Sequence, residues 1–291
     1  MSTPTALARR SWGCALTEYT RRDEVVIATK VCEPMASGPN RGGLSRKAIF
    51  TELDASLRRL GTDYIDLYQI HRADPTTSWE ETLEALHDAV KPGKVRYIGV
   101  SSLWAWEFTK TLCLQTINGW TRFVSIQDHY NLLDREEERE VHPLCSDQHI
   151  AVMPWSPLAR GKLTRDWDAE TKRSQTDPTQ GFLYEGDADQ AIVAKVAEIA
   201  AVRAIPRAQV ALAWMLSKPV VTAPIVGAGK PQHLDDAIAA VGLQLSETEI
   251  AASKALIGPA PQRFPCGSDH PRPYCQHPTT ASYSTRHAEE P

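Results

Sequence analysis

The sequence has 291 residues, of which 42% are hydrophobic and 23% are charged, the composition of a globular protein with a sizeable buried core. Its formal net charge of −4 provides no positive field to attract nucleic acid or an anionic membrane. No apolar run approaches the roughly 20 residues of a membrane-spanning helix. The first residues also lack the apolar stretch of a signal peptide. We therefore expect a cytoplasmic protein that binds neither nucleic acid nor membrane.

Short apolar runs alternate with helical patterns along the chain. We predict strands at residues 24–30, 64–71, 95–102, 123–127, 150–156 and 220–227. We predict helices at residues 7–19, 45–60, 76–90, 187–202, 207–216 and 232–241. The strand runs are rich in β-branched and aromatic residues and nearly unbroken in apolarity, which is typical of parallel strands covered on both faces. The alternation predicts an α/β fold with a parallel sheet, either a barrel or a doubly wound sheet.

The number of strand patterns bears on that choice, because about six are found and a closed (β/α)8 barrel needs eight. The chain enters a helical pattern before its first strand, as though the first units of a barrel were absent. Residues 167–186 have no clear period and are predicted to form a long loop. Pro, Ser, Thr and His dominate from residue 258 onward. We therefore predict a domain at residues 1–257 and a disordered tail at residues 258–291.

The six cysteines are scattered, which is typical of reduced thiols rather than of a disulfide framework. Cys266, His270, Cys275 and His277 cluster in the tail, but their spacing matches no familiar zinc pattern. We predict no metal. The run REEERE at residues 135–140 is predicted to be a solvated helix face.

Polar residues close the predicted strands, and sites in parallel α/β folds form at those ends. Lys30 closes the first strand and His71 the second. A partly desolvated ammonium would lower the pKa of a neighbouring phenol or carboxyl, and a His beside it could bond the same small molecule. The alternative is that both side chains simply meet solvent.

The later strand ends offer groups for a flat polar ligand. Ser101, Ser102 and Gln127 could bond a carboxamide, and Trp155 offers a face for a heterocycle or belongs to the core. After the last strand, residues 227–231 (GAGKP) open a helix whose N-terminus could hold a phosphate, or they form a tight turn.

Six segments together resemble the aldo-keto reductase family, and they occur in the family's order over residues 7–256. They are DEVVIATKV, SLRRLGTDYIDLYQIHR, ALHDAVKPGKVRYIGVSS, FVSIQDHYNLLDREEEREV, PWSPLARGKLT and PIVGAGKPQHLDDAIAAV. The match is closest to the fungal aryl-alcohol dehydrogenase and norsolorinic acid reductase branch. The resemblance implies an eight-stranded TIM barrel that reduces an aldehyde or ketone, aromatic or polyketide-like, with NADPH and without a metal. Such a protein would serve secondary metabolism.

The resemblance also implies roles for individual residues. Lys30 would lower the pKa of the catalytic Tyr, and His71 would orient the substrate carbonyl. The nicotinamide would be held by Ser101, Ser102, Gln127 and Trp155, although the family more often has Asn at the position of Ser102. Residues implied at the pyrophosphate are Ser156, Leu158, Gly161 and Lys162. Residues implied at the adenosine end are Gly227, Lys230, Gln232 and His233.

Three departures from the family pattern limit what the resemblance implies, and one of them is Ala237, which replaces the Asn that usually contacts adenine. The family's catalytic Asp and Tyr should precede the first helix, so the chain resembles an N-terminally truncated member. Tyr68 is no substitute, because it is three residues from His71 and points to the opposite face of its strand. His233 and Gly229 stand where related branches have Arg, which leaves NAD as an alternative to NADP. A non-catalytic nicotinamide-binding or scaffold protein is therefore the alternative function.

Overall fold

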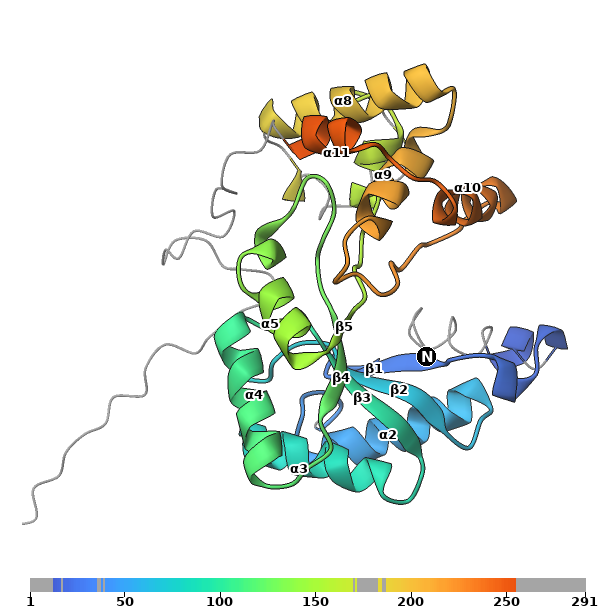
Figure 1. Cartoon of the computed structure of the whole chain (residues 1–291). Coiled ribbons are helices and arrows are strands. Elements are labelled where there is room, and N and C mark those ends of the chain that lie inside the picture. Colours follow the sequence, from blue (N-terminus) through green and yellow to red (C-terminus); the bar gives the residue numbers. More distant parts are fainter. Residues whose placement is uncertain are drawn as a thin grey trace, which may run out of the picture. The chain divides into compact units, whose positions relative to one another are not determined.

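A five-stranded parallel sheet organises the part of the chain that the computed structural model describes, residues 13–254 without 17, 36–37, 39, 170, 172–182 and 185–186 (Figure 1). The strands are β1 (Ala28–Val31), β2 (Ile65–Ile70), β3 (Val95–Ser101), β4 (Phe123–Gln127) and β5 (Ala151–Val152). Each strand pairs in parallel with the next one along the chain. A doubly wound sheet reverses its strand order at a switch point, whereas a barrel keeps chain order. The sheet is consistent with a partial (β/α)8 barrel.

Two strand predictions were too long, and proline explains both. The fifth strand ends at Val152 instead of residue 156, because Pro154 has no N–H to continue the ladder. The predicted strand at residues 220–227 is reduced to one bridge, Val152 with Val221, and Pro224 interrupts it. The segment still follows β5, since N–H groups of Thr222 and Ile225 bond carbonyls of Val152 and Pro154 at 2.9 and 2.8 Å. The first strand was also misplaced: it starts at Ala28 rather than residue 24 and ends at Val31 rather than Lys30.

Helices follow the strands. Their bounds are α2 (Arg46–Leu60), α3 (Trp79–Val90), α4 (Ala105–Ile117), α5 (Val141–Gln148), α8 (Asp187–Arg203), α9 (Arg207–Leu216), α10 (Pro231–Val241) and α11 (Glu247–Lys254). Short 3-10 turns are η1 (Arg22–Glu24), η2 (Glu136–Glu138) and η3 (Ala159–Thr164). The predicted end of α2 is confirmed: Gly61 takes a left-handed conformation with φ 66°, and its N–H bonds the carbonyl of Leu57. Only residues 13–16 and 18–19 of the predicted first helix are described, and they are helical.

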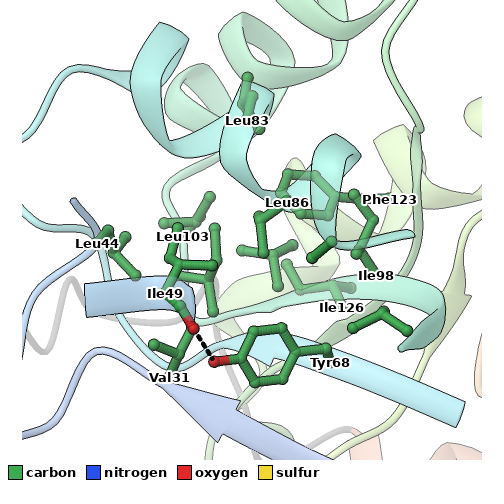
Figure 2. Close-up of a cluster of buried hydrophobic side chains, with 14 of the residues drawn as sticks. Val31, Leu44, Ile49, Tyr68, Leu83, Leu86, Ile98, Leu103, Phe123 and Ile126 are labelled. Atoms are coloured by element: carbon green, nitrogen blue, oxygen red, sulfur yellow. Dashed lines mark hydrogen bonds between the residues drawn. The ribbon is translucent and has the colours of Figure 1, made fainter. Parts of the chain in front are cut away.

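Helices α2 and α3 cover one face of the sheet and bury its largest apolar cluster (Figures 1 and 2). Tyr68 lies in that cluster, fully buried, and its hydroxyl donates to the carbonyl of Ile49 in α2 at 3.2 Å (Figure 2). The expectation that Tyr68 faces away from the strand-end site is therefore confirmed. A second cluster packs Tyr130, Tyr184 and Trp214 with residues of α8 and α9.

Within the described residues no single helix is long and apolar enough to cross a membrane, although the bent pair of residues 188–203 and 207–216 passes that test jointly. The described residues also hold no group of three or more His, Cys, Asp or Glu side chains that could bind a metal. The cluster of Cys266, His270, Cys275 and His277, the predicted tail and most of the predicted loop at residues 167–186 lie outside the described residues.

Candidate functional site

The ammonium of Lys30 and the amide of Gln127 meet at the carboxyl ends of β1 and β4. Lys30 Nζ donates to Gln127 Oε1 at 2.6 Å. Gln127 is the last residue of β4 and is buried, while Lys30 is half-buried. Because an ammonium can only donate, this contact identifies which end of the amide is the oxygen. The Gln127 NH₂ group therefore points away from Lys30 as a donor for a ligand carbonyl.

His71 follows β2 directly and is hydrogen-bonded to the last residue of β1. Its backbone N–H donates to the carbonyl of Val31 at 2.9 Å, and it lies two residues beyond Gln69, the residue that pairs with Lys30 across the two strands. The structure thus brings both predicted catalytic residues, Lys30 and His71, to the carboxyl ends of neighbouring strands. The His71 ring is half-buried.

Ser101 and Ser102 end β3 beside the indole of Trp155. Ser101 is buried, and its hydroxyl lies 3.4 Å from that of Ser102. Ser102 takes a left-handed conformation with φ 51°, which turns the chain away from the strand. Trp155 Nε1 donates to Ser102 Oγ at 3.4 Å, a long hydrogen bond. Trp155 is half-buried, so part of its surface is packed and part is accessible to a ligand.

The segment after Trp155 has a run of left-handed residues. Ser156, Ala159 and Arg160 have φ of 55°, 46° and 53°, and Gly161 has φ of 94°. Such turns collect backbone N–H groups on one side and can bind anions, which suits the predicted pyrophosphate position. Leu158 packs on the second apolar cluster. Lys162 donates to the carbonyl of Trp167 at 3.1 Å and lies 4.1 Å from the centre of its ring, a contact that the sequence did not indicate.

The residues predicted at the adenosine end gather at the N-terminus of α10. Gly227, Lys230, Gln232 and His233 are all exposed, and Lys230 is the N-cap residue. The N–H of Gly229 donates to His233 Nδ1 at 3.3 Å, and Gln232 Nε2 donates to Asp236 Oδ1 at 3.2 Å. An open helix N-terminus with one added lysine can accept a phosphate.

The profile of the aldo/keto reductase family matches residues 6–257. The chain belongs to this family. It is 47% identical over 225 residues to an aldo-keto reductase of Fusarium vanettenii, an alignment that covers 76% of this chain and 60% of the relative. It is 44% identical over 260 residues to versiconal hemiacetal acetate reductase of Aspergillus parasiticus, with 82% and 75% covered.

A third relative, a protein of Schizosaccharomyces pombe named after aryl-alcohol dehydrogenases, is 48% identical over 213 residues, with 72% of this chain and 60% of the relative covered. The predicted likeness to the fungal branch is thereby confirmed. The chain spans about 60% of the length of the Fusarium and Schizosaccharomyces relatives that it matches.

Polar residues that follow β4 form pairs that the sequence did not indicate. His142 Nε2 lies 2.7 Å from Asp128 Oδ2, and both side chains are buried. His129 stacks on Trp155 with ring centroids 4.0 Å apart and planes inclined by 10°. No local pattern marks these pairs, because their partners are distant in sequence.

The prediction of a solvated face at residues 135–140 was wrong in part. Glu138 bonds Arg135 and also accepts from the hydroxyl of the fully buried Tyr130. Burial is the main cause that raises the pKa of Tyr130 far above its usual value, and the hydrogen bond to Glu138 is the second. A phenol that holds its proton so firmly inside the core is unsuited to donate it to a substrate.

Proposed function

We propose that this chain binds NADPH at its strand-end site and reduces an aldehyde or ketone, aromatic or polyketide-like, to the alcohol. The observation that carries the proposal is the hydrogen bond between Lys30 and Gln127. It gathers an ammonium and an oriented amide at one edge of the sheet, next to His71. Family membership supports the reaction class, and a relative is named versiconal hemiacetal acetate reductase.

The residues present fit a nicotinamide cofactor. With Gln127 Oε1 held by Lys30, the Gln127 NH₂ group can donate to the carboxamide oxygen. The hydroxyls of Ser101 and Ser102 can accept from the carboxamide NH₂, and the indole of Trp155 can stack on the pyridine ring. When bound, the cofactor would supply the hydride.

The phosphates would be held by backbone amides rather than by a dense set of cations. The pyrophosphate would lie at the left-handed run from Ser156 to Gly161, with Leu158 and Lys162 beside it. The N–H groups of Ala159 and Gly161 already bond the carbonyls of Ser156 and Leu158, so the other amides of the run would hold it. At α10, Gly227, Lys230, Gln232 and His233 would meet the adenosine end, and Lys230 would favour a 2′-phosphate. We therefore propose NADP as the cofactor and NAD as the weaker ligand.

Substrate would lie over the ends of β1 and β2. The ammonium of Lys30 would stabilise the negative charge that develops on the carbonyl oxygen as hydride reaches the carbon. The half-buried His71 could donate a hydrogen bond to that oxygen and then the proton that completes the alcohol. Trp104 and Trp106 follow β3 and are 46% and 65% exposed. Exposed aromatic side chains in the segment that follows a site strand suit a flat aromatic or polyketide-like substrate.

The test is NADPH consumption by the purified chain with a panel of aromatic aldehydes and polyketide-like ketones. We expect turnover above background, lost in Lys30→Met and retained in Lys110→Met, an exposed position on α4. Tight NADPH binding without turnover on any substrate would refute reduction by this chain. Absence of any nicotinamide nucleotide binding would refute the whole proposal.

One observation favours a second candidate, a nicotinamide-binding protein without catalysis. Carbonyl reduction needs a proton donor, and general acid catalysis contributes roughly 10²–10⁴-fold to the rate. Tyr68 is bonded to Ile49 and Tyr130 to Glu138, so neither phenol is directed to the strand-end site. Saturable NADPH binding together with undetectable turnover would establish this candidate.

A further inference from the structure

We propose that His129 is a positioning residue that fixes the plane of the Trp155 indole for a flat nitrogen heterocycle. The inference rests on the proposed function, because the heterocycle would be the nicotinamide. The two rings stack with centroids 4.0 Å apart and planes inclined by 10°. His129 is 9% exposed, whereas Trp155 is half-buried. Since His129 covers one face of the indole, the accessible ring surface belongs to the opposite face and the edges.

The imidazole is held at both nitrogens, so it cannot turn freely. His129 Nδ1 lies 3.3 Å from Asp134 Oδ2, and Nε2 lies 2.6 Å from the hydroxyl of Tyr184. Asn131 Nδ2 also lies 3.3 Å from Nε2. Because an amide NH₂ only donates and a carboxylate only accepts, Nε2 of a neutral ring is the acceptor and Nδ1 carries the proton. The Tyr184 hydroxyl then donates to Nε2. All three side chains are buried, and hydrogen bonds in such surroundings are costly to break.

Asn131 joins this network to the chain that carries the indole. Its Nδ2 donates to the carbonyl of Ser156 at 3.1 Å and to the hydroxyl of Tyr184 at 3.0 Å. Its Oδ1 accepts from the N–H groups of Leu133 and Asp134 at 2.8 and 3.1 Å. Asn131 therefore ties the residue after Trp155 to both groups that hold His129.

Backbone contacts also hold the Trp155 indole against the His129 ring. The N–H of Trp155 donates to the carbonyl of Asp128 at 2.7 Å, and His129 and Trp155 form an isolated parallel bridge. Within the described part of the chain, the indole edge makes one side-chain hydrogen bond, the long one to Ser102 at 3.4 Å. A long hydrogen bond orients a ring weakly. The ring plane of Trp155 thus depends on His129.

Binding of two ligands tests this role in solution. We compare NADPH with 2′-phospho-ADP-ribose, which lacks the nicotinamide, for wild type, His129→Asn and His149→Asn. His149 is an exposed histidine with φ 55°, a conformation that Asn accepts, so it is a matched control. We expect His129→Asn to weaken NADPH binding about fivefold, the size of an aromatic stack, and to leave the fragment's affinity unchanged. His129→Phe keeps a flat ring and should restore NADPH binding to within about twofold.

Equal losses for NADPH and for the fragment would indicate a general disturbance of the fold and overturn the proposal. Unchanged NADPH affinity in a folded His129→Asn would overturn it as well. His149→Asn should match wild type for both ligands.

A measurement without cofactor separates this inference from the proposed function. The chain has eight Trp, and the Trp155 indole N–H resonance is identified by its loss in Trp155→Phe. We expect this resonance to shift and broaden in His129→Asn and to return towards its wild-type position in His129→Phe. If wild type binds no NADPH, the proposed function fails but the positioning role can still be tested. An indole resonance of Trp155 that is the same in His129→Asn as in wild type would overturn the positioning role.

Discussion

Lys30 and Gln127 touch at 2.6 Å although two strands separate β1 from β4. Three strand spacings of about 4.8 Å would put their backbones roughly 14 Å apart in a flat sheet. The two side chains can meet because the sheet curls towards the face that carries them. The contact is thus evidence for barrel-like curvature as well as for an assembled site.

Lys30→Met should weaken NADPH binding about tenfold, because the Gln127 amide loses the charged donor that orients it and hydrogen bonds to charged groups contribute about 1.5–3 kcal/mol. The measurement is a fluorescence titration with NADPH. Lys110→Met makes the same substitution on an exposed face of α4 and should leave the affinity unchanged. Equal affinities of wild type and Lys30→Met would show that Gln127 does not hold the cofactor.

Ser102→Asn should stabilise the fold by a few tenths of a kcal/mol, because Asn tolerates left-handed backbone better than Ser. Ser102 has φ 51° at the end of β3. Ser102→Val should have the opposite effect and cost at least about 1 kcal/mol, because a β-branched residue is strained there. Urea unfolding of the three proteins measures both changes. If both substitutions changed the free energy of unfolding in the same direction, backbone strain at Ser102 would not be the cause.

Gly99→Ala should destabilise the protein by about 1–3 kcal/mol through overpacking on the inner face of the sheet. An added Cβ would lie 2.6 Å from Ser125 Oγ and 3.1 Å from the Ser125 carbonyl oxygen. The hydroxyl can rotate, but the backbone oxygen cannot move without the strand. Gly242→Ala is the control, since its Cβ would meet nothing within 4 Å. Thermal unfolding should separate the two variants, and equal melting temperatures would contradict the packing argument.

The stability contributed by Glu249 should depend on pH. Two bonds of 2.6 Å from Arg203 join α11 to α8, and the hydrogen bond from Arg203 lowers the Glu249 pKa to about 2. Because the folded pKa lies below the unfolded value of about 4.3, the stabilisation is complete above that value and is lost as pH falls towards 2. The pair is partly exposed, so it contributes about 1 kcal/mol.

Glu249→Gln should therefore be less stable than wild type by about 1 kcal/mol at pH 7, with a difference that shrinks below about pH 4. Urea unfolding at pH 7, 4 and 3 measures this difference. Glu247→Gln, an exposed change in the first turn of the same helix, should show no such trend. A constant difference at all three pH values would mean that ionisation of Glu249 does not contribute.

The sequence by itself determined the alternation of strands and helices and most of the strand-end residues. Helix α9 begins and ends where its apolar pattern predicted, and β4 ends at Gln127 as predicted. These features are local: caps, periodicity and apolar runs act over a few residues. The shortened fifth and sixth strands also have a local cause, since Pro154 and Pro224 are visible in the sequence.

Only the tertiary structure decided which of these residues touch. Lys30 and Gln127 are 97 residues apart, and His129 and Tyr184 are 55 apart. The hydrogen bond from the buried Tyr130 hydroxyl to the half-buried Glu138 ties part of an apparently solvated charge run to the core. Such contacts depend on the curl of the sheet and on the packing of distant helices. A hydrogen bond between side chains so far apart leaves no periodic signal in the chain, because its geometry exists only once the intervening strands have paired.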